Sequence, residues 1–524
     1  MPLTNEPLRR EWTRFRRPGR LMAMVAAALA VVAFGLIYAF GNHASCNGPC
    51  PVDPTGPDGS LVNDQFAFTH QDLGENGSIT VRMTSMTGTI TYPPPHHDQI
   101  LPGLVPWAKA GIIIKDGVRP GSSYAALMLT GAHGVRMQHD YRHDVAGRAG
   151  GVSAESPRWL RLTRSGDTVT GYESADGERW TKVGAARLAG LPKTAQVGLF
   201  AASPGDLTLQ PVGFGGGVKE HVRFTQASGV FDKVTLQGGA TAGGWKTDTL
   251  GDMNGTDWEK YHQPSGAVEK GGTITVTGVG DIGPAGAEDG ARPVESTLGG
   301  LSIALIVVLV VAVRFATSGG PGAPDNRRTF AARAVVVGAV TFATGLVAAG
   351  IVVPVGTSVL KGNGITVIGV SAFTGVRVVV GTATALALTA VLAYALGALL
   401  RRARAAVPVV LLAVAVPYVV TSYPLIADGP ARWLLRLAPA AGFAVQQTLV
   451  EHPQVLAHYA PSAGYFPLPW MAGIGLLCAY AALLLWLAAR RLPSMSPTPQ
   501  SPRVASTQAT DPAVREGGQP ADWR

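Results

Sequence analysis

The chain has 524 residues, of which 47% are hydrophobic and only 15% are charged, and its formal net charge is +9. This length exceeds that of one compact domain, and a mean hydropathy of +0.21 with so few charges argues against an ordinary soluble enzyme. A basic balance is often typical of nucleic-acid binding, but here the arginines cluster beside apolar segments. Because that placement fits membrane topology signals and anionic headgroups, we expect no nucleic-acid partner.

The first forty residues predict an interfacial segment followed by a membrane span. Residues 1–20 place apolar and aromatic side chains among basic ones, which is typical of an amphipathic segment at the inner membrane surface. The apolar run 21–40 is long enough to cross a bilayer. We interpret it as an uncleaved anchor rather than a signal peptide, because it is long and no clear small-residue cleavage site precedes Asn42.

Two of the three cysteines, Cys46 and Cys50, lie just beyond this run, in a linker that we place at 41–63. A close pair on the outer side of a membrane predicts a local disulfide, with two free thiols as the alternative. Two cysteines alone do not make a typical metal site, because such a site needs four ligands.

The region from 64 to 295 predicts an all-β domain. Short alternating runs, such as SITVRM, WLRLT and TITVT, have Gly, Pro, Asp or Asn near their ends. This spacing indicates a β-sandwich or barrel. We divide the region into a sandwich at 64–213 and a second β-rich part at 214–295.

The second half of the chain predicts five further spans, about six in all. Arginines precede span one and follow spans two, four and six, so the positive-inside rule places both termini in the cytoplasm. The predicted fold class is an α-helical polytopic protein of the cell membrane, with a large extracytoplasmic all-β sandwich between helices 1 and 2. The five spans are 297–313, 334–355, 376–400, 405–423 and 468–489; we expect a cytoplasmic loop at 314–333 and a disordered tail at 490–524.

Three blocks of the β region, WAKAGIIIKDG, WLRLTRSGDTVTGYESADGERWTKVG and QVGLFAASP, together resemble the concanavalin A-like lectin/glucanase sandwich, a laminin G-like fold. The resemblance covers 64–213 and implies a module that binds substrate, glycan or a partner. A glycosidase needs two carboxylates that flank the scissile bond, whereas the acids here are scattered in turns. We therefore expect no catalytic residues.

Aromatic and histidine side chains supply the candidate ligand contacts of this region. Trp107, Trp159 and Trp180 are candidates for stacking on a sugar, with core packing as the alternative. We expect no metal site, because the spacing of the histidines fits no strong motif; those considered are His96, His97, His133, His139 and His143.

The N-terminal stretch LRREWTRFRRPGR contributes to a second resemblance, together with WLLRLAPAAGFAVQQTLVEHPQV and SAGYFPLPWMAGIGLLCAYAALLLWLAARR near the C-terminus. These segments resemble permease subunits of exporter-type (type 2) ABC transporters. The resemblance implies a homodimer or a heterodimer with another permease, coupled to a separate ATPase subunit. It also implies an outer irregular or re-entrant segment at 428–467, before the last span. The candidate elbow or coupling residues are Trp12, Arg14, Arg16, Arg17, Arg327 and Arg328.

The chain contains no G-x-x-x-x-G-K-[ST] motif, so ATP hydrolysis has to come from the partner, and we expect no cofactor on this chain. Ionisable residues are nearly absent from the centres of the spans, which argues against a proton relay. Two alternatives stay open: a membrane-anchored cell-surface carbohydrate-binding or sensor protein, and a surface glycoside hydrolase.

Overall fold

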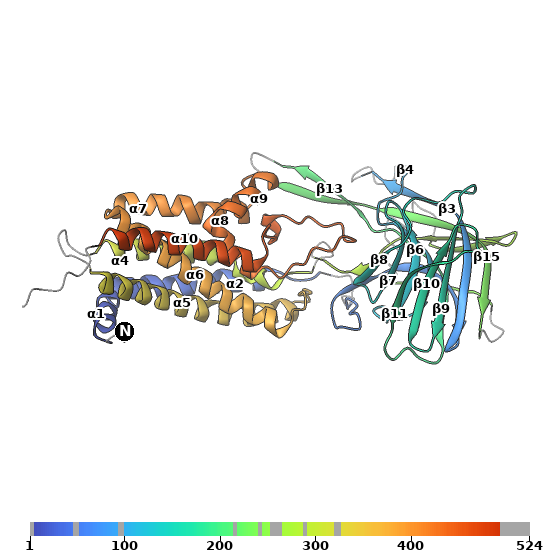
Figure 1. Cartoon of the computed structure of the whole chain (residues 1–524), viewed down its shortest axis with the longest axis horizontal. Helices are drawn as coiled ribbons and strands as arrows, with labels where there is room; N and C mark the ends of the chain where they lie inside the picture. Colours follow the sequence, from blue (N-terminus) through green and yellow to red (C-terminus); the bar gives the residue numbers. More distant parts are fainter. Residues whose placement is uncertain are drawn as a thin grey trace, which may run out of the picture.

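The computed structural model describes residues 5–45, 52–92, 99–212, 217–238, 244–251, 265–286, 291–318 and 326–492. The molecule is elongated, with a bundle of long helices at one end and a large β domain at the other (Figure 1). We call the end of the bundle that carries the N-terminal helix the α1 end. The opposite end, which faces the β domain, is the sandwich end.

The helices run back and forth along the bundle. α2 (Pro18–Gly41) precedes the β domain. At the sandwich end, the C-terminus of α2 contacts the C-terminus of α5 (Arg327–Gly362), and the Asn363 side chain donates to the carbonyl of Ala39 at 3.0 Å. The other helical elements are α1 (Asn5–Phe15), η2 (Val294–Leu298), α4 (Leu301–Ala316), α6 (Ala372–Leu400), α7 (Ala403–Val410), η3 (Leu411–Ala415), α8 (Val416–Ser422), α9 (Asp428–Leu437), η4 (Pro439–Gln446), η5 (Pro461–Ala463) and α10 (Trp470–Arg490).

Five helical segments are long and apolar enough to cross a membrane: α2, α5, α6, the composite Ala403–Ser422 and α10. The predicted span 297–313 corresponds to α4, an apolar helix of only 16 residues that follows the 3₁₀ turn η2. A span needs about 20 residues. Within the described ranges, five of the six predicted spans therefore correspond to helices long enough to cross a membrane, and the sixth corresponds to a shorter apolar helix.

The composite segment Ala403–Ser422 is irregular at its centre. Pro408 lies inside α7 and Pro417 begins α8, and between these helices runs the π-helical stretch η3. Proline has no N–H to donate to the preceding turn, so the backbone adjusts locally around it. The helix nevertheless continues through both prolines, from Ala403 to Ser422.

The β domain consists of two large antiparallel sheets. One has the strand order β11-β10-β9-β3-β15-β18-β17, with β4 beside β3, and the other has the order β16-β2-β12-β5-β6-β7-β8. The strands are β2 (Phe66–Leu73), β3 (Asn76–Thr91), β4 (Ile100–Pro102), β5 (Lys109–Lys115), β6 (Tyr124–Thr130), β7 (Gly134–His139), β8 (His143–Ala146), β9 (Arg158–Ser165), β10 (Thr168–Ser174), β11 (Thr181–Arg187), β12 (Ala195–Ala202), β15 (Thr225–Gln237), β16 (Lys246–Leu250), β17 (Gly266–Lys270) and β18 (Thr273–Gly278).

Apolar side chains from both sheets pack together as the core of the domain. Ile112 on β5 and Leu160 on β9 are fully buried in one cluster, as expected where alternate residues of a strand point to one face. At Gly198 the strands approach closely, because an added Cβ would lie 1.9 Å from the carbonyl oxygen of Thr69. Since β15 to β18 complete the same two sheets, the sandwich includes strands from both predicted β ranges.

The chain enters and leaves the β domain at one place. β1 (Val62–Asp64) pairs with β19 (Ile282–Pro284) in a small antiparallel sheet. Two buried lysines at the ends of β5 hold these strands: Lys115 donates to Asp64 at 2.8 Å, and Lys109 contacts Asp281 and the carbonyl of Ile282. Buried ion pairs therefore tie the connections to the sandwich.

Candidate functional site

The N-terminal helix α1 lies across the α1 end of the bundle, against α5 (Figure 1). It ends at Phe15, and α2 begins at Pro18, a residue suited to the first turn of a helix. The chain therefore turns sharply at Arg16 and Arg17. Within the predicted segment 1–20, the structure therefore places the helix α1, a turn and the start of α2.

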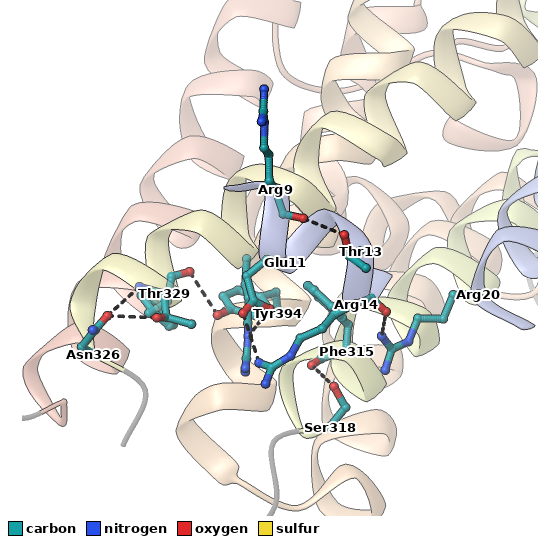
Figure 2. A network of polar contacts seen from close by, with 12 residues as sticks. Arg9, Glu11, Thr13, Arg14, Arg20, Phe315, Ser318, Asn326, Thr329 and Tyr394 are labelled. Carbon is teal, nitrogen blue, oxygen red and sulfur yellow. Dashed lines mark hydrogen bonds and ion pairs between the residues drawn. The ribbon is translucent and has the colours of Figure 1, made fainter. Parts of the chain in front are cut away.

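A buried ion pair holds α1 in place. Arg333 of α5 donates from Nε to Glu11 Oε2 at 2.9 Å, and Arg14 donates to Glu11 Oε1 at 3.1 Å (Figure 2). The side chains of Glu11 and Arg333 are 1% and 3% exposed, whereas Arg14 is 45% exposed. Because removal of one partner leaves the other charge buried and uncompensated, Glu11 and Arg333 fix the position of α1.

Aromatic rings extend this contact into the bundle. Phe15 is fully buried and meets Phe315 of α4 edge-on, with ring centroids 5.1 Å apart. The guanidinium of Arg20 lies 4.9 Å from the Phe315 ring. The Tyr394 hydroxyl of α6 donates to the carbonyl of Phe330 at 3.1 Å (Figure 2). The network thus joins α1, α2, α4, α5 and α6 at one end of the bundle.

The predicted elbow and coupling residues surround this network on its exposed side. Trp12 is 44% exposed, and Arg14, Arg16 and Arg17 are exposed beside it. Arg327 and Arg328 are exposed in the first turn of α5, which Asn326 caps by accepting from the backbone N–H of Thr329 at 2.8 Å (Figure 2). Glu11 and the partner role of Arg333 were not among the predicted site residues. The signal in the sequence is that Glu11 lies between arginines, Arg10 and Arg14, in a basic amphipathic segment.

The three candidate tryptophans do not form one site. Trp107 is 4% exposed and stacks on His133, with ring centroids 4.1 Å apart, so it belongs to the packed interior. Trp159 and Trp180 are half-buried. Lys233 lies 5.4 Å from the Trp159 ring and Arg161 lies 3.9 Å from the Trp180 ring. These two rings are therefore already covered in part by cations.

The described part of the chain contains no group of three or more potential metal ligands. His139 and His143 stack with centroids 4.3 Å apart. His96, His97, Cys46 and Cys50 lie outside the described residues, and so do positions 493–524 of the predicted tail.

A histidine joins the β domain to the helical part. The hairpin of β13 (Asp206–Pro211) and β14 (Val218–Arg223) reaches towards α9 (Figure 1). Between them, His458 contacts Glu220 of β14 from Nδ1 at 2.9 Å and Asp428 of α9 from Nε2 at 2.7 Å. Its side chain is 7% exposed. Each ring nitrogen of His458 thus lies at hydrogen-bond distance from a carboxyl group, and the ring bridges the hairpin and α9.

His458→Gln is expected to loosen the hairpin, because glutamine cannot donate to both carboxylates. A contact of this kind contributes about 1–3 kcal/mol, so amide exchange in β14 should speed up by about 5- to 150-fold in hydrogen-exchange mass spectrometry. His221→Gln, on the same hairpin, is the control; equal exchange in both variants would contradict the prediction.

No family model and no curated protein matches the sequence. Three solved structures show weak similarity. A functionally unknown protein from Saccharomyces cerevisiae is 16% identical over 37% of this chain and 84% of its own, with a TM-score of 0.22. Scytalido-glutamic peptidase is 8% identical over 41% and 98%, with a TM-score of 0.27. Lectin I-B4 from Griffonia simplicifolia is 12% identical over 36% and 90%, with a TM-score of 0.16. At these TM-scores the similarities assign neither a family nor an activity to this chain.

Proposed function

We propose that this chain is the membrane-spanning permease subunit of an ABC transporter, driven by ATP hydrolysis in a separate subunit. The observation that carries the proposal is the docked helix α1. An amphipathic helix fixed across the end of an apolar bundle by the buried Glu11–Arg333 pair suits the inner surface of a membrane. In the proposed orientation the α1 end is cytoplasmic, and the sandwich is extracellular.

The opposite end of the bundle supports the same proposal. Before the last long helix the chain forms α9, the 3₁₀ turns η4 and η5, and irregular segments between them, instead of a simple loop. All eight residues of η4, which ends at Gln446, are buried among the helices. Irregular backbone is tolerated at membrane depth only where protein covers it. This agrees with the irregular or re-entrant segment that the resemblance to exporter-type permeases implies at 428–467.

The proposed coupling surface consists of Trp12, Arg14, Arg16, Arg17, Arg327 and Arg328, which are exposed at the α1 end. Arginine side chains pair well with carboxylates of a partner protein, and exposed tryptophan is a frequent interface anchor. The proposed partners are an ABC ATPase and a second permease chain, in a homodimer or heterodimer. The outer domain would then bind substrate, glycan or a partner.

Co-purification of the tagged full chain from its native membranes tests this proposal. We expect a stoichiometric ATPase in mild detergent, with ATP hydrolysis that needs both chains. Trp12→Ala combined with Arg327→Gln should lower ATPase recovery at least fivefold at equal yield of the chain. Arg436→Gln on α9, at the sandwich end, is the matched control. A chain that purifies alone and is indifferent to ATP would contradict the proposal.

The second candidate function is a membrane-anchored cell-surface carbohydrate-binding or sensor protein. Trp159 and Trp180 are its candidate contacts, because both are only half-buried and a partly exposed aromatic ring offers apolar surface to a ligand. A glycan array probed with the full chain in detergent tests this candidate. Binding that Trp180→Ala abolishes and Trp107→Phe preserves would support it, and no binding to any glycan would contradict it.

A further inference from the structure

A cavity of about 310 Å³ lies at the sandwich end of the bundle, where several elements meet. Tyr38 from the last turn of α2, Ser302 from the first turn of α4 and Tyr418 from α8 line it. If the chain crosses the membrane as proposed, these turns lie at the depth of the outer headgroups, where tyrosine is typical. The cavity therefore combines polar groups with a position at the lipid interface.

A buried amide group of this cavity is incompletely satisfied. Gln446, the last residue of η4, is 4% exposed and lines the cavity. Its side chain neighbours the hydroxyl of Tyr418, but its Nε2 has no acceptor within 3.5 Å in the described ranges of the chain. A buried donor without an acceptor is costly, and buried side-chain donors are normally paired. The position of Gln446 thus indicates that an acceptor oxygen of a ligand completes the site.

An unpaired cation stands beside the same cavity. Arg292 is exposed, lines the cavity and makes no ion pair with any described residue. Its backbone is fixed, because its N–H donates to Thr366 at 2.8 Å and its carbonyl accepts from Ile368 at 2.9 Å. Arginine is suited to phosphate oxygens, which it binds through two parallel N–H groups.

The carboxyl group of Glu295 is already held by the protein. Its oxygens accept from the backbone N–H and the hydroxyl of Thr448. Burial raises its pKa above the ordinary value, and these hydrogen bonds only partly offset the shift. The carboxyl oxygens are therefore occupied by hydrogen bonds from Thr448.

We propose that this cavity binds the phosphate of an anionic lipid headgroup from the outer leaflet. Gln446 and Arg292 supply the donors, and Tyr38 and Tyr418 line the same space. The proposal rests on the membrane orientation of the proposed function. It does not depend on an ATPase, so the two proposals fail separately.

Native mass spectrometry of the purified full chain tests the site. The chain is equilibrated with mixed micelles that contain equal amounts of phosphatidylglycerol and phosphatidylcholine. We expect the wild-type chain to retain one phosphatidylglycerol, and Gln446→Leu and Arg292→Gln each to reduce its retention at least fivefold. Lys361→Gln, which removes an exposed cation at the same end of the bundle outside the cavity, should retain the lipid as the wild type does.

A stability measurement shows whether the variants still fold. Because Arg292 is exposed, Arg292→Gln is not expected to disturb the fold, and its thermal midpoint should equal that of the wild type.

Equal retention of phosphatidylglycerol by the wild type and both variants, or equal retention of the two lipids, would overturn the proposal. Binding of radiolabelled inorganic phosphate without lipid, lost in both variants, would assign the site to a soluble anion and overturn the lipid source. Resistance of the chain to alkaline extraction from membranes checks the orientation premise independently.

Discussion

Glu11→Gln is expected to release α1 from the bundle and to lower stability by about 3–5 kcal/mol, as when one partner of a buried ion pair is removed. The substitution keeps the shape of the side chain but leaves the guanidinium of Arg333, which is 3% exposed, without its carboxylate. Phe15 should then lose its contact with Phe315. The measurements are the thermal midpoint in detergent and hydrogen exchange across α1.

Arg14→Gln provides the matched control for this prediction. Arg14 contacts the same carboxylate, but it is 45% exposed, and pairs of this kind contribute about 0–1 kcal/mol. The double variant Glu11→Leu/Arg333→Met should recover much of the lost stability, since apolar replacement of a buried pair is often tolerated. If Arg14→Gln destabilises the chain as much as Glu11→Gln does, the buried pair is not what holds α1.

The amphipathic N-terminal segment and the long apolar helices follow from the sequence because they depend on local patterns. Alternation of basic and apolar residues predicts a surface helix over 1–20, and continuous apolar runs predict the long helices. The same patterns do not reveal a pair separated by 322 positions, such as Glu11 and Arg333. In the sequence, Arg333 was one of several arginines that mark topology, and its burial depends on where α1 docks.

In the β domain, too, local patterns predict the strands but not which strands pair with one another. Alternating runs such as WLRLT predict strands, and the structure places a strand there, β9. We divided the β region at residue 213 because the resemblance to the concanavalin A-like sandwich ends there. In the structure, however, β15 pairs with β3 over a separation of about 150 residues, and no local pattern reveals a pairing over this distance. The sequence KAGIIIK of β5 is typical of a buried strand, but it carries a lysine at each end, and only the contacts with β1 and with the residues at β19 explain why both lysines are buried.

Lys115→Met is expected to destabilise the sandwich by about 3–5 kcal/mol, because it leaves the carboxylate of Asp64 buried without its cation. Lys115 and Asp64 have fully buried side chains 2.8 Å apart, and Asp64 also accepts from Tyr141 and from the N–H of Gly121. Loss of the pair should release β1 from the sandwich and speed amide exchange in β1 and β19. Lys182→Met, at an exposed strand position, is the control and should leave exchange unchanged.

The pH dependence of the two lysine variants distinguishes a desolvated ammonium group from a merely well-packed side chain. Burial lowers the pKa of Lys115 below its ordinary 10.5, and the attraction of Asp64 only partly offsets this. Between the folded-state pKa and 10.5 the unfolded chain binds more protons than the folded chain, so the unfolding free energy rises with pH. Below the folded-state pKa, burial of the charged ammonium group lowers the unfolding free energy by its full amount. Above 10.5 this loss is absent, because the group is neutral in both states. Denaturant titrations of the full chain at several alkaline pH values should therefore show an upward slope in Lys182→Met that is smaller in Lys115→Met. Equal slopes would mean that Lys115 pays no desolvation cost in the folded chain.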